Sequence, residues 1–351
     1  MGVEKISIDT FIELYQDSTI IDVRSESEFE HAHIPTALSI PLFNNEERKV
    51  VGTTYKQQSK EAAIKKGLEY FGPKMKEIIV AVEKIIKDKN TSEKTIVVHC
   101  WRGGMRSAGV AWLLDLYGFK IFTIIGGYQA YRNWVLDQFT KNWKFNILGG
   151  YTGSGKTIVL EELVKKDQPV IDLEGIAGHK GSAFGRIGLP AQPSSEMFEN
   201  ILAKQLDERS KIFPNKHIWL EDESQRIGAV SIPHMLWNTI RNQNVYFLNI
   251  PFEERLSYLV KTYGELNKTE LIEAILRIQK KLGGLETKNA VEYLNNSDTL
   301  NSFRILLQYY DKLYKKSLDK REALEEKLTI IETTTVDSAY NSNLLIKQYE
   351  R

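Results

Sequence analysis

Short apolar runs alternate with helical patterns along the first 140 residues of the chain. Three β-branched or continuously apolar runs predict strands at Thr19–Val23, Thr95–His99 and Lys120–Ile124. Ser25, with Glu28 three residues later, forms a capping box that predicts a short helix. Arg106–Leu116 predicts a longer helix that ends at Gly118, and residues 44–90 predict a charged, mostly helical insertion. Strands that alternate with helices are typical of a parallel α/β sheet.

A second α/β pattern begins after a polar joint at Phe139–Trp143. Strands are predicted at Phe145–Leu148, Val170–Leu173, His217–Leu220, Asn244–Ile250 and Leu328–Glu332. Lys156–Lys165 predicts a helix, and the remaining pattern from Pro251 onward is helical and charged. We therefore predict two α/β domains, residues 1–141 and 142–351, the second with a helical C-terminal region.

The composition narrows the function classes. The chain has 351 residues and a formal net charge of +1, so an RNA site is expected only as a local patch. A single cysteine excludes an intramolecular disulfide, a CxxC redox pair and a cysteine-rich zinc site, and we assign no metal ligands. No apolar stretch approaches the ~18 residues of a membrane span, and the first residues lack a signal-peptide pattern. We expect a cytoplasmic enzyme with a reduced thiol and no membrane partner.

The cysteine lies in the segment HCWRGGMRS, directly after a predicted strand and before a predicted helix. In such a turn, backbone N–H groups and the positive end of the helix face the Cys100 sulfur, which favours a thiolate nucleophile. Arg102 and Arg106 add positive charge, and Gly103 and Gly104 permit the required backbone conformations. This surrounding favours a reactive cysteine over a buried structural one.

The first domain resembles the rhodanese family over nearly all of residues 5–136. The matching segments are Asp22–Arg24, Glu28–Phe29, His33–Ala37, Cys100–Ser107, Ile125–Tyr128 and Trp134. The resemblance implies a rhodanese-like parallel sheet in which Cys100 carries a persulfide or perselenide as a group-transfer intermediate. It also implies that Asp22 and Arg24 help to hold the active-site loop.

One feature departs from simple sulfurtransferases, which usually place the arginine five positions after the cysteine. Here Arg106 stands six positions after Cys100, giving the pattern HCxxxxxR. The longer loop resembles that of dual-specificity and cell-cycle phosphatases, so a cysteine-dependent phosphatase is one interpretation. The other is that the wider loop admits a tetrahedral donor such as selenophosphate. The loop alone leaves both open.

The segment from Gly150 to Thr157 matches the phosphate-binding pattern GxxxxGK[ST], between an apolar strand and a helix. We predict the binding residues Gly150, Gly153, Ser154, Gly155, Lys156 and Thr157. Backbone amides would surround a phosphate, Lys156 would neutralise it, and Thr157 could hold Mg²⁺. A Walker B strand should end in Asp, whereas His217–Leu220 runs into Glu221-Asp222-Glu223. NTP hydrolysis therefore stays open, as does a need for Mg²⁺.

Two further segments carry candidate ligand-binding residues. Glu174–Gly188 is glycine-rich and follows a predicted strand, so we interpret it as a ligand loop. Its polar candidates are His179, Lys180, Ser182 and Arg186. Glu221–Arg226 also follows a strand, where it is either a second ligand segment or a solvated turn.

The C-terminal helices combine basic and aromatic side chains. The basic residues are Lys280, Lys281, Lys312, Lys315, Lys316, Lys320 and Arg321, and the aromatic residues among them are Tyr309, Tyr310 and Tyr314. Such a mixture suits RNA contact, but it equally fits a core stripe of tyrosines beside a solvated lysine face. We favour the second interpretation.

The order of the two motifs resembles the tRNA 2-selenouridine synthase family over essentially the whole chain. The supporting segments are Val51–Thr53, Tyr55–Gln58, Cys100–Ser107, Gly149–Thr157, His179–Gly185 (which includes Ala183) and Glu221–Ser224. The resemblance implies action on wobble 2-thiouridine in tRNAs for Lys, Glu and Gln. It implies geranylation with geranyl diphosphate, then replacement of the geranylthio group by selenium from selenophosphate.

From this resemblance we expect two co-substrates, geranyl diphosphate and selenophosphate, and no tightly bound cofactor. Partners would be tRNA and an enzyme that supplies selenophosphate. We predict that the phosphate-binding loop holds the diphosphate of the prenyl donor. A cysteine-dependent phosphatase and a non-enzymatic, nucleotide-gated adaptor are the rival hypotheses; the adaptor predicts tight nucleotide binding and an inert thiol.

Overall fold

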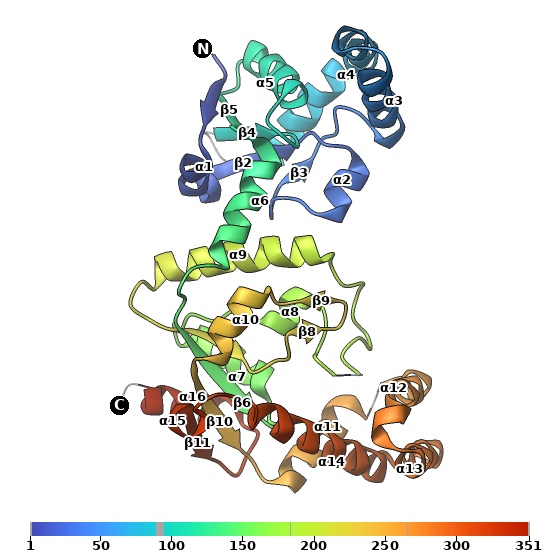
Figure 1. Cartoon of the computed structure of the whole chain (residues 1–351), viewed down its shortest axis with the longest axis vertical. Helices are drawn as coiled ribbons and strands as arrows, with labels where there is room; N and C mark the ends of the chain where they lie inside the picture. Colours follow the sequence, from blue (N-terminus) through green and yellow to red (C-terminus); the bar gives the residue numbers. More distant parts are fainter. Residues whose placement is uncertain (1, 89–94, 183, 265, 350–351) are drawn as a thin grey trace. The chain divides into compact units, whose positions relative to one another are not determined.

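A computed structural model describes residues 2–88, 95–182, 184–264 and 266–349 (Figure 1). The chain divides into two compact units, Met1–Gln138 and Phe139–Arg351. Both units contain a parallel sheet with helices packed against it, as the alternation of strands and helices predicts. None of the helices within these ranges is long and apolar enough to cross a membrane.

The first unit contains a five-stranded parallel sheet in the order β1-β5-β4-β2-β3. Its strands are β1 (Glu4–Ile6), β2 (Ser18–Asp22), β3 (Leu38–Ser39), β4 (Thr95–His99) and β5 (Ile121–Ile124). The predicted strands correspond to β2, β4 and β5. The short edge strands β1 and β3 were not predicted, because three and two residues are too few to show a periodicity.

Helices cover both faces of this sheet (Figure 1). They are α1 (Ile8–Leu14), the 3-10 helix η1 (Tyr15–Asp17), α2 (Glu26–His31), α3 (Asn45–Gln57), α4 (Lys60–Asp88), α5 (Met105–Tyr117) and α6 (Gly127–Gln138). The predicted capping box opens α2, with Ser25 and Glu28 reciprocally bonded. Gly118, with φ 109°, ends α5 as predicted.

The insertion between β3 and β4 is helical, as predicted, and consists of α3 and α4; its residues 89–90 lie outside the described ranges. It belongs to the core, because α4 buries Phe71, Ile78 and Val82 against strand residues such as Val98. Phe71 lies close to Gly109 of α5, where an added Cβ would be 3.6 Å from its ring. The apolar stripe of α4 therefore packs against the sheet and α5 and forms part of the core of the first unit.

The second unit contains a parallel sheet in the order β11-β10-β6-β7. Its strands are β6 (Phe145–Gly150), β7 (Ile218–Glu221), β10 (Asn244–Asn249) and β11 (Leu328–Glu332). A separate two-stranded antiparallel ribbon joins β8 (Arg226–Ile227) to β9 (Val230–Ser231). The strands that follow β6 in the chain lie on both sides of it, so its carboxyl end is where ligands bind in such sheets.

The prediction of a strand at Val170–Leu173 is wrong. Only Val170 forms an isolated bridge, to Trp219 of β7. Two residues later, the Asp172 carboxylate accepts a hydrogen bond from Gly175 N at 2.8 Å and begins a helix at Leu173. An N-cap inside the apolar run therefore ends the extended segment early.

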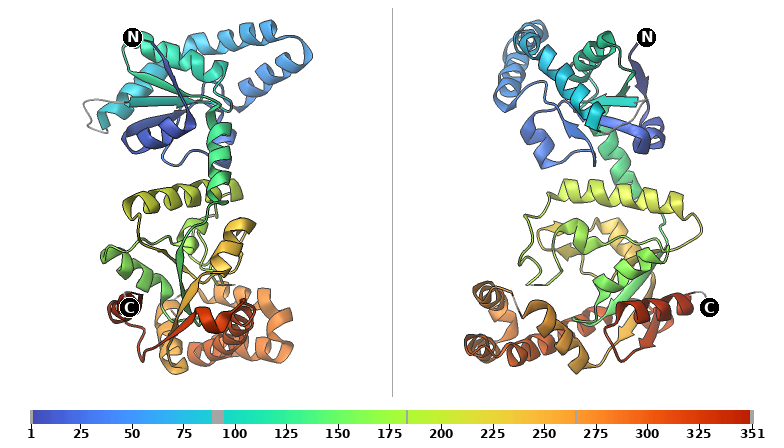
Figure 2. Two further views of the ribbon diagram at one scale, coloured as in Figure 1. Left: turned by 60° about the vertical axis from the view of Figure 1, so that its left-hand side comes forward. Right: turned by 180° about the vertical axis from the view of Figure 1, so that it is seen from behind.

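Helices of the second unit pack around its sheet and extend beyond it. They are α7 (Lys156–Lys165), α8 (Leu173–Ala177), α9 (Ser195–Ile212), α10 (His234–Arg241), α11 (Phe252–Tyr263), α12 (Lys268–Leu282), α13 (Gly284–Asn295), α14 (Thr299–Leu318), α15 (Leu324–Lys327) and α16 (Ser338–Tyr349). Figure 2 shows α11–α14, in orange to red, gathered at one end of this unit. Their apolar faces form a core of their own, and this confirms the predicted helical region.

Replacing Phe71 by Ala should lower the free energy of unfolding of the first unit by about 3–5 kcal/mol, because it removes a buried ring at the α4–α5 contact. Leu68→Ala, at an exposed position of the same helix, should change it by less than about 0.5 kcal/mol. Native-state hydrogen exchange of β4 amides measures both values in the whole chain. If both substitutions lowered the free energy of unfolding equally, Phe71 would not be the buried side of α4.

Candidate functional site: a phosphate loop with an apolar cavity, and a cysteine loop

The phosphate loop joins the end of β6 to the start of α7. Gly155 adopts a left-handed conformation, φ 72°, directly before Lys156 begins the helix. Gly153 has φ 80°, and a Cβ there would lie 2.9 Å from both the Arg255 carbonyl oxygen and Leu259. Glycine is therefore required at Gly153 by conformation and by space. The loop has the strand–loop–helix setting that phosphate binding needs.

Two polar side chains of this loop face its interior. Lys156 Nζ donates a hydrogen bond to the Gly150 carbonyl oxygen at 2.9 Å. Ser154 is only 1% exposed, and its Oγ has no hydrogen-bond partner among the described residues. A buried hydroxyl without a partner costs free energy, so a ligand oxygen at this point would satisfy it.

Arg255 of α11 is hydrogen bonded to the backbone of the phosphate loop. It donates to the carbonyl oxygens of Thr152, at 2.9 Å, and Ile250, at 3.0 Å. The same guanidinium forms a bidentate pair with Asp311 of α14, at 2.8 and 2.9 Å. These bonds connect the phosphate loop to two helices of the C-terminal region.

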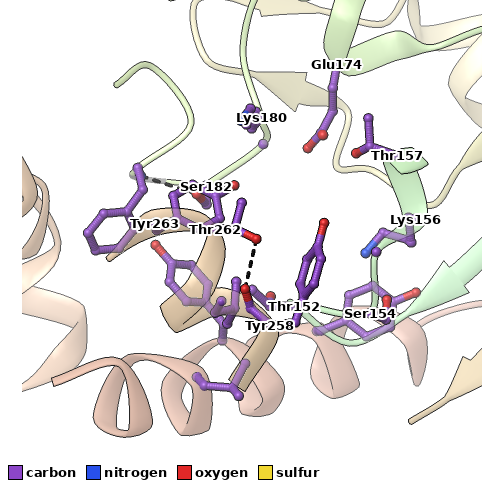
Figure 3. Close-up of a pocket in the computed structure, with 18 of the residues that line it drawn as sticks. Thr152, Ser154, Lys156, Thr157, Glu174, Lys180, Ser182, Tyr258, Thr262 and Tyr263 are labelled. Atoms are coloured by element: carbon purple, nitrogen blue, oxygen red, sulfur yellow. Dashed lines mark hydrogen bonds between the residues drawn. The ribbon is translucent and has the colours of Figure 1, made fainter. Parts of the chain in front are cut away.

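A cavity of about 470 Å³ opens from the loop, and both polar and apolar side chains line it (Figure 3). The phosphate loop and the polar residues of the lining are Thr152, Gly153, Ser154, Gly155, Lys156, Thr157, Glu161, Glu174, Lys180, Gly181, Ser182, Asp222, Glu223 and Thr262. The aliphatic and aromatic residues, mainly from α11 and α14, are Ile158, Phe184, Tyr258, Leu259, Tyr263, Phe303, Leu306, Leu307, Tyr310 and Tyr314. A ligand with an anionic head and a hydrocarbon body matches this lining.

The predicted ligand loop reaches this cavity in part. Lys180 and Ser182 line it, whereas His179 and Arg186 do not. Arg186 is exposed, and His179 Nδ1 is buried without a hydrogen-bond partner in the described part of the chain. Ala183 lies outside the described residues. Most predicted phosphate-loop residues line the cavity; Gly150 contributes the carbonyl oxygen that Lys156 contacts.

Asp222, which follows β7 where a Walker B aspartate is expected, is fully engaged by other side chains. Arg321 donates to its Oδ1 at 2.5 Å, and the Tyr314 hydroxyl donates to its Oδ2 at 2.7 Å. Tyr314 in turn accepts a hydrogen bond from Gly150 N at 3.2 Å. Burial, with the charge of Asp222, raises the pKa of Tyr314 well above its ordinary value. Asp222 thus links Arg321 and Tyr314, and through Tyr314 the amide of Gly150, by hydrogen bonds.

Three glutamates lie close together beside Lys156. Burial, followed by the charges of Glu223 and Glu221, raises the pKa of Glu174 to about 9. Burial and the charge of Asp172 raise the pKa of Glu221 to about 8, and burial raises the pKa of Glu223. No group of three or more His, Cys, Asp or Glu side chains in the described ranges is arranged to hold a metal ion.

The cysteine loop lies between β4 and α5 in the first unit. Cys100 is 3% exposed, and its Sγ lies 3.3 Å from Ser107 Oγ. Gly104 immediately precedes α5, so the amino end of a 13-residue helix follows the loop. The Cys100 carbonyl oxygen accepts from Tyr128 N at 2.9 Å, which ties the loop to α6.

The two arginines of the cysteine loop differ in their surroundings. Arg106 forms an ion pair with Glu28 of α2 at 2.8 Å. Burial alone would raise the pKa of Glu28, but its hydrogen bond and charge interaction with Arg106 lower it overall. Arg102 is exposed beside Trp101. Arg102 is therefore the accessible arginine, while Arg106 braces the loop against α2.

Asp22 and Arg24 form a fully buried ion pair at 2.6 Å. Arg24 also donates to the Ala32 carbonyl oxygen at 2.7 Å, and its guanidinium lies 3.9 Å from the Tyr128 ring centre. Burial opposes ionisation of Asp22, but His99 and Arg24 lower its pKa overall. The pair forms no hydrogen bond with the Cys100 sulfur among the described residues, and its role in holding the loop stays a prediction.

Sequence reasoning missed the apolar lining of the cavity, Glu174 and the Arg255–Asp311 pair. The tyrosines of α14 were assigned to a core stripe, and Tyr314 is indeed buried, but Tyr310 and Tyr314 also line the cavity. The helical periodicity of Phe303, Leu307 and Tyr310 was the available signal. It could not show which cavity that face would border.

Comparisons with known proteins cover both units. Residues 143–333 match the family model described as the tRNA 2-selenouridine synthase AAA domain, and residues 7–133 match the rhodanese-like domain. A tRNA 2-selenouridine synthase of Sulfurovum sp. is 33% identical over 87% of this chain and 90% of its own. One of Nitrosomonas europaea is 32% identical over 90% and 93%. A solved N-terminal domain from Clostridium difficile 630 is 41% identical over 38% of this chain and 99% of its own, with a TM-score of 0.34.

Tyr314→Phe should lower the free energy of unfolding of the second unit by about 1–3 kcal/mol, since Asp222 and Gly150 N each lose a buried partner. It should also weaken binding of inorganic diphosphate, because Gly150 begins the phosphate loop. Tyr340→Phe, at an exposed position of α16, is the control. Urea unfolding measures the free energy of unfolding, and calorimetry measures the affinity for diphosphate. If both quantities were native in Tyr314→Phe, the Tyr314 hydroxyl would contribute neither to stability nor to diphosphate binding.

Proposed function

The chain belongs to the tRNA 2-selenouridine synthase family, and we propose that it converts wobble 2-thiouridine of tRNA into 2-selenouridine. The proposed sequence has two steps. The first transfers a geranyl group from geranyl diphosphate to the sulfur of the base. The second replaces the geranylthio group by selenium from selenophosphate. The proposed substrates are tRNAs for Lys, Glu and Gln, with selenophosphate delivered by a partner enzyme.

The observation that carries the geranyl step is that the phosphate loop and apolar side chains of α11 and α14 line the same cavity. The phosphate loop and Lys156 suit a diphosphate. The helices contribute Leu259, Leu306 and Leu307 to the lining, beside tyrosines. An isoprenoid chain buries apolar surface there without leaving a polar group unpaired.

The surroundings of Asp222 favour a prenyl diphosphate over a nucleoside triphosphate for a second reason. Hydrolysis of ATP or GTP in P-loop proteins relies on Mg²⁺ held with the help of a Walker B aspartate. Asp222 is bonded to Arg321 and Tyr314 through both carboxylate oxygens. Transfer of a prenyl group needs only that the diphosphate be bound and then released as the leaving group. The phosphate loop can bind a diphosphate that is not part of a nucleotide.

For the selenium step we assign Cys100 as the nucleophile and Arg102 as the accessible positive charge beside it. Alkylation makes the sulfur of the base a better leaving group, so the geranylated base is the form in which selenium replaces it. Cys100 follows a buried strand and precedes the amino end of α5, a position that favours a thiolate. Asp22, Arg24 and Arg106 hold the loop in this conformation.

Cys100→Ser should stop the reaction after geranyl transfer. With 2-thiouridine tRNA, geranyl diphosphate and selenophosphate, the variant should accumulate S-geranyl-2-thiouridine, and formation of 2-selenouridine should fall by roughly 10³-fold or more. Mass spectrometry of the nucleosides measures both products, and the geranyl product is the internal control for folding. Absence of both products from the native protein, together with hydrolysis of an aryl phosphate that Cys100→Ser lacks, would favour a cysteine-dependent phosphatase instead.

Lys156→Ala should weaken binding of geranyl diphosphate by roughly 10–100-fold, because one charge-assisted contact contributes about 1.5–3 kcal/mol. Lys165→Ala, at the other end of α7 in an exposed pair with Glu162, should bind as the native protein does. Calorimetric titration with geranyl diphosphate compares the three proteins. Undiminished binding and geranyl transfer by Lys156→Ala would place the prenyl donor outside this loop.

A further inference from the structure

Two carboxyl groups, those of Glu174 and Glu223, line the cavity and lie close to each other. The backbone of Gly181 lies against both: a Cβ there would be 2.5 Å from Glu223 Oε1 and 2.7 Å from Glu174 Oε1. Figure 3 shows the Glu174 carboxyl pointing into the cavity on the side of Lys156 and Thr157. The pair therefore lies where the head of a bound diphosphate would be.

Two carboxylates held this close repel each other, which favours a proton on one of them. Glu221 adds to the negative surroundings: its Oε1 accepts from Glu174 N at 2.7 Å, and its buried Oε2 has no partner in the described part of the chain. The ionisable groups that face the pair are Lys156 of α7, Lys180 of the preceding loop, Glu221 of β7, Asp222 beside it and Tyr263 of α11. Lys156 is the cation whose charge acts on both carboxyl groups.

The same cavity carries an independent sign of an anionic ligand. Ser154 is 1% exposed, lines the cavity and has an Oγ without a hydrogen-bond partner among the described residues. This hydroxyl and the backbone amides of its loop can donate hydrogen bonds to an oxygen of a bound anion. Lys156 and Glu174 line the same cavity as this hydroxyl (Figure 3).

We propose that the Glu174–Glu223 pair is the proton donor to the diphosphate that leaves during geranyl transfer, in the role that a divalent cation fills in other phosphate loops. This inference rests on the function proposed above. Protonation neutralises the charge that develops on the leaving oxygen, and a protonated pair admits a diphosphate that two carboxylates would repel.

The proposed step balances without an oxidant or a reductant. A lone pair of the thione sulfur forms the bond to C1 of the geranyl group while the C1–O bond breaks. The electron pair of that bond stays on the diphosphate oxygen, which takes the proton of the carboxyl pair. N3 of the base loses its proton to solvent, and the pair regains one proton from solvent. The products are S-geranyl-2-thiouridine and hydrogen diphosphate.

The test compares native protein with Glu174→Gln, Glu223→Gln and the control Glu162→Gln, which lies on α7 outside the cavity. Glutamine keeps the shape and a hydrogen-bond donor but has no proton to give. The full chain is assayed with 2-thiouridine tRNA and geranyl diphosphate, in EDTA and in Mg²⁺. Binding of geranyl S-thiolodiphosphate, whose bridging sulfur resists transfer, is measured in parallel by calorimetry.

We expect Glu174→Gln to lower kcat for geranyl transfer by about 10²–10⁴-fold, the range of general acid catalysis, with analogue binding close to the native value. Glu162→Gln should behave as native, and native activity should persist in EDTA. Since the donor acts in its protonated form, native kcat should fall as the pH rises through the pKa of Glu174, raised to about 9, and Glu174→Gln should lack this fall.

Three results would overturn the inference. Native-like kcat in Glu174→Gln would show that its proton is not used. A native reaction that stops in EDTA and returns with Mg²⁺ would make the pair a cation site. Loss of analogue binding in both Gln variants, with Glu174→Asp failing to restore kcat, would give the pair a structural role. In each case the native protein still forms the geranyl product, whereas a native protein that forms none contradicts the proposed function itself.

Discussion

A chain of buried and partly buried hydrogen bonds runs from Arg321 through Asp222 and Tyr314 to the amide of Gly150, and the candidate site of the second unit depends on it. A carboxylate as buried as that of Asp222 is stable only when its oxygens are paired. Here the pairing joins the end of β7, helix α14 and the first residue of the phosphate loop. The Arg255–Asp311 pair joins the same helix to the loop at Thr152. Helix α14 braces the phosphate loop while it also contributes apolar side chains to the cavity. The phosphate loop and the apolar side chains of α14 therefore keep a fixed position relative to each other.

Both units use buried ion pairs to brace a loop whose backbone carries the ligand-facing groups. In the first unit Asp22 and Arg24 lie beneath the cysteine loop, and Glu28 engages Arg106. The charges of Arg24 and Arg106 are thus paired with the carboxylates of Asp22 and Glu28, which the sequence alone does not reveal. Gly104 directly before α5 and the exposed Arg102 follow Cys100 in the chain. In the second unit burial raises the pKa values of Glu174, Glu221 and Glu223, which favours their neutral forms.

Much of the fold follows from local patterns in the sequence. Continuous apolar runs predict β4 and β6, and the Ser25–Glu28 capping box and Gly118 predict where helices begin and end, because each depends on neighbours within a few residues. The failure at Val170–Leu173 is also local, since Asp172 caps a helix inside an apolar run. The phosphate loop is predictable because its strand, glycines and lysine are contiguous.

The rest of the site depends on residues far apart in the chain. Asp222 meets Tyr314 and Arg321 only after folding, 92 and 99 positions away. Glu174 of α8 and Glu223 after β7 lie 49 positions apart in the chain and come together only in the fold. The face of α14 that borders the cavity is set by the packing of four helices. A pattern of apolar positions shows that a face is buried, but not whether it meets a core or a ligand.

The central claim is that one cavity holds a prenyl diphosphate with its head on the phosphate loop and its chain along α11 and α14. The most direct test is a crystal structure of the protein with geranyl S-thiolodiphosphate. The account predicts the diphosphate against Lys156 and Ser154, and the geranyl chain against Leu306 and Leu307. A prenyl chain bound outside this cavity, with the phosphate loop taken instead by a nucleotide, would contradict it.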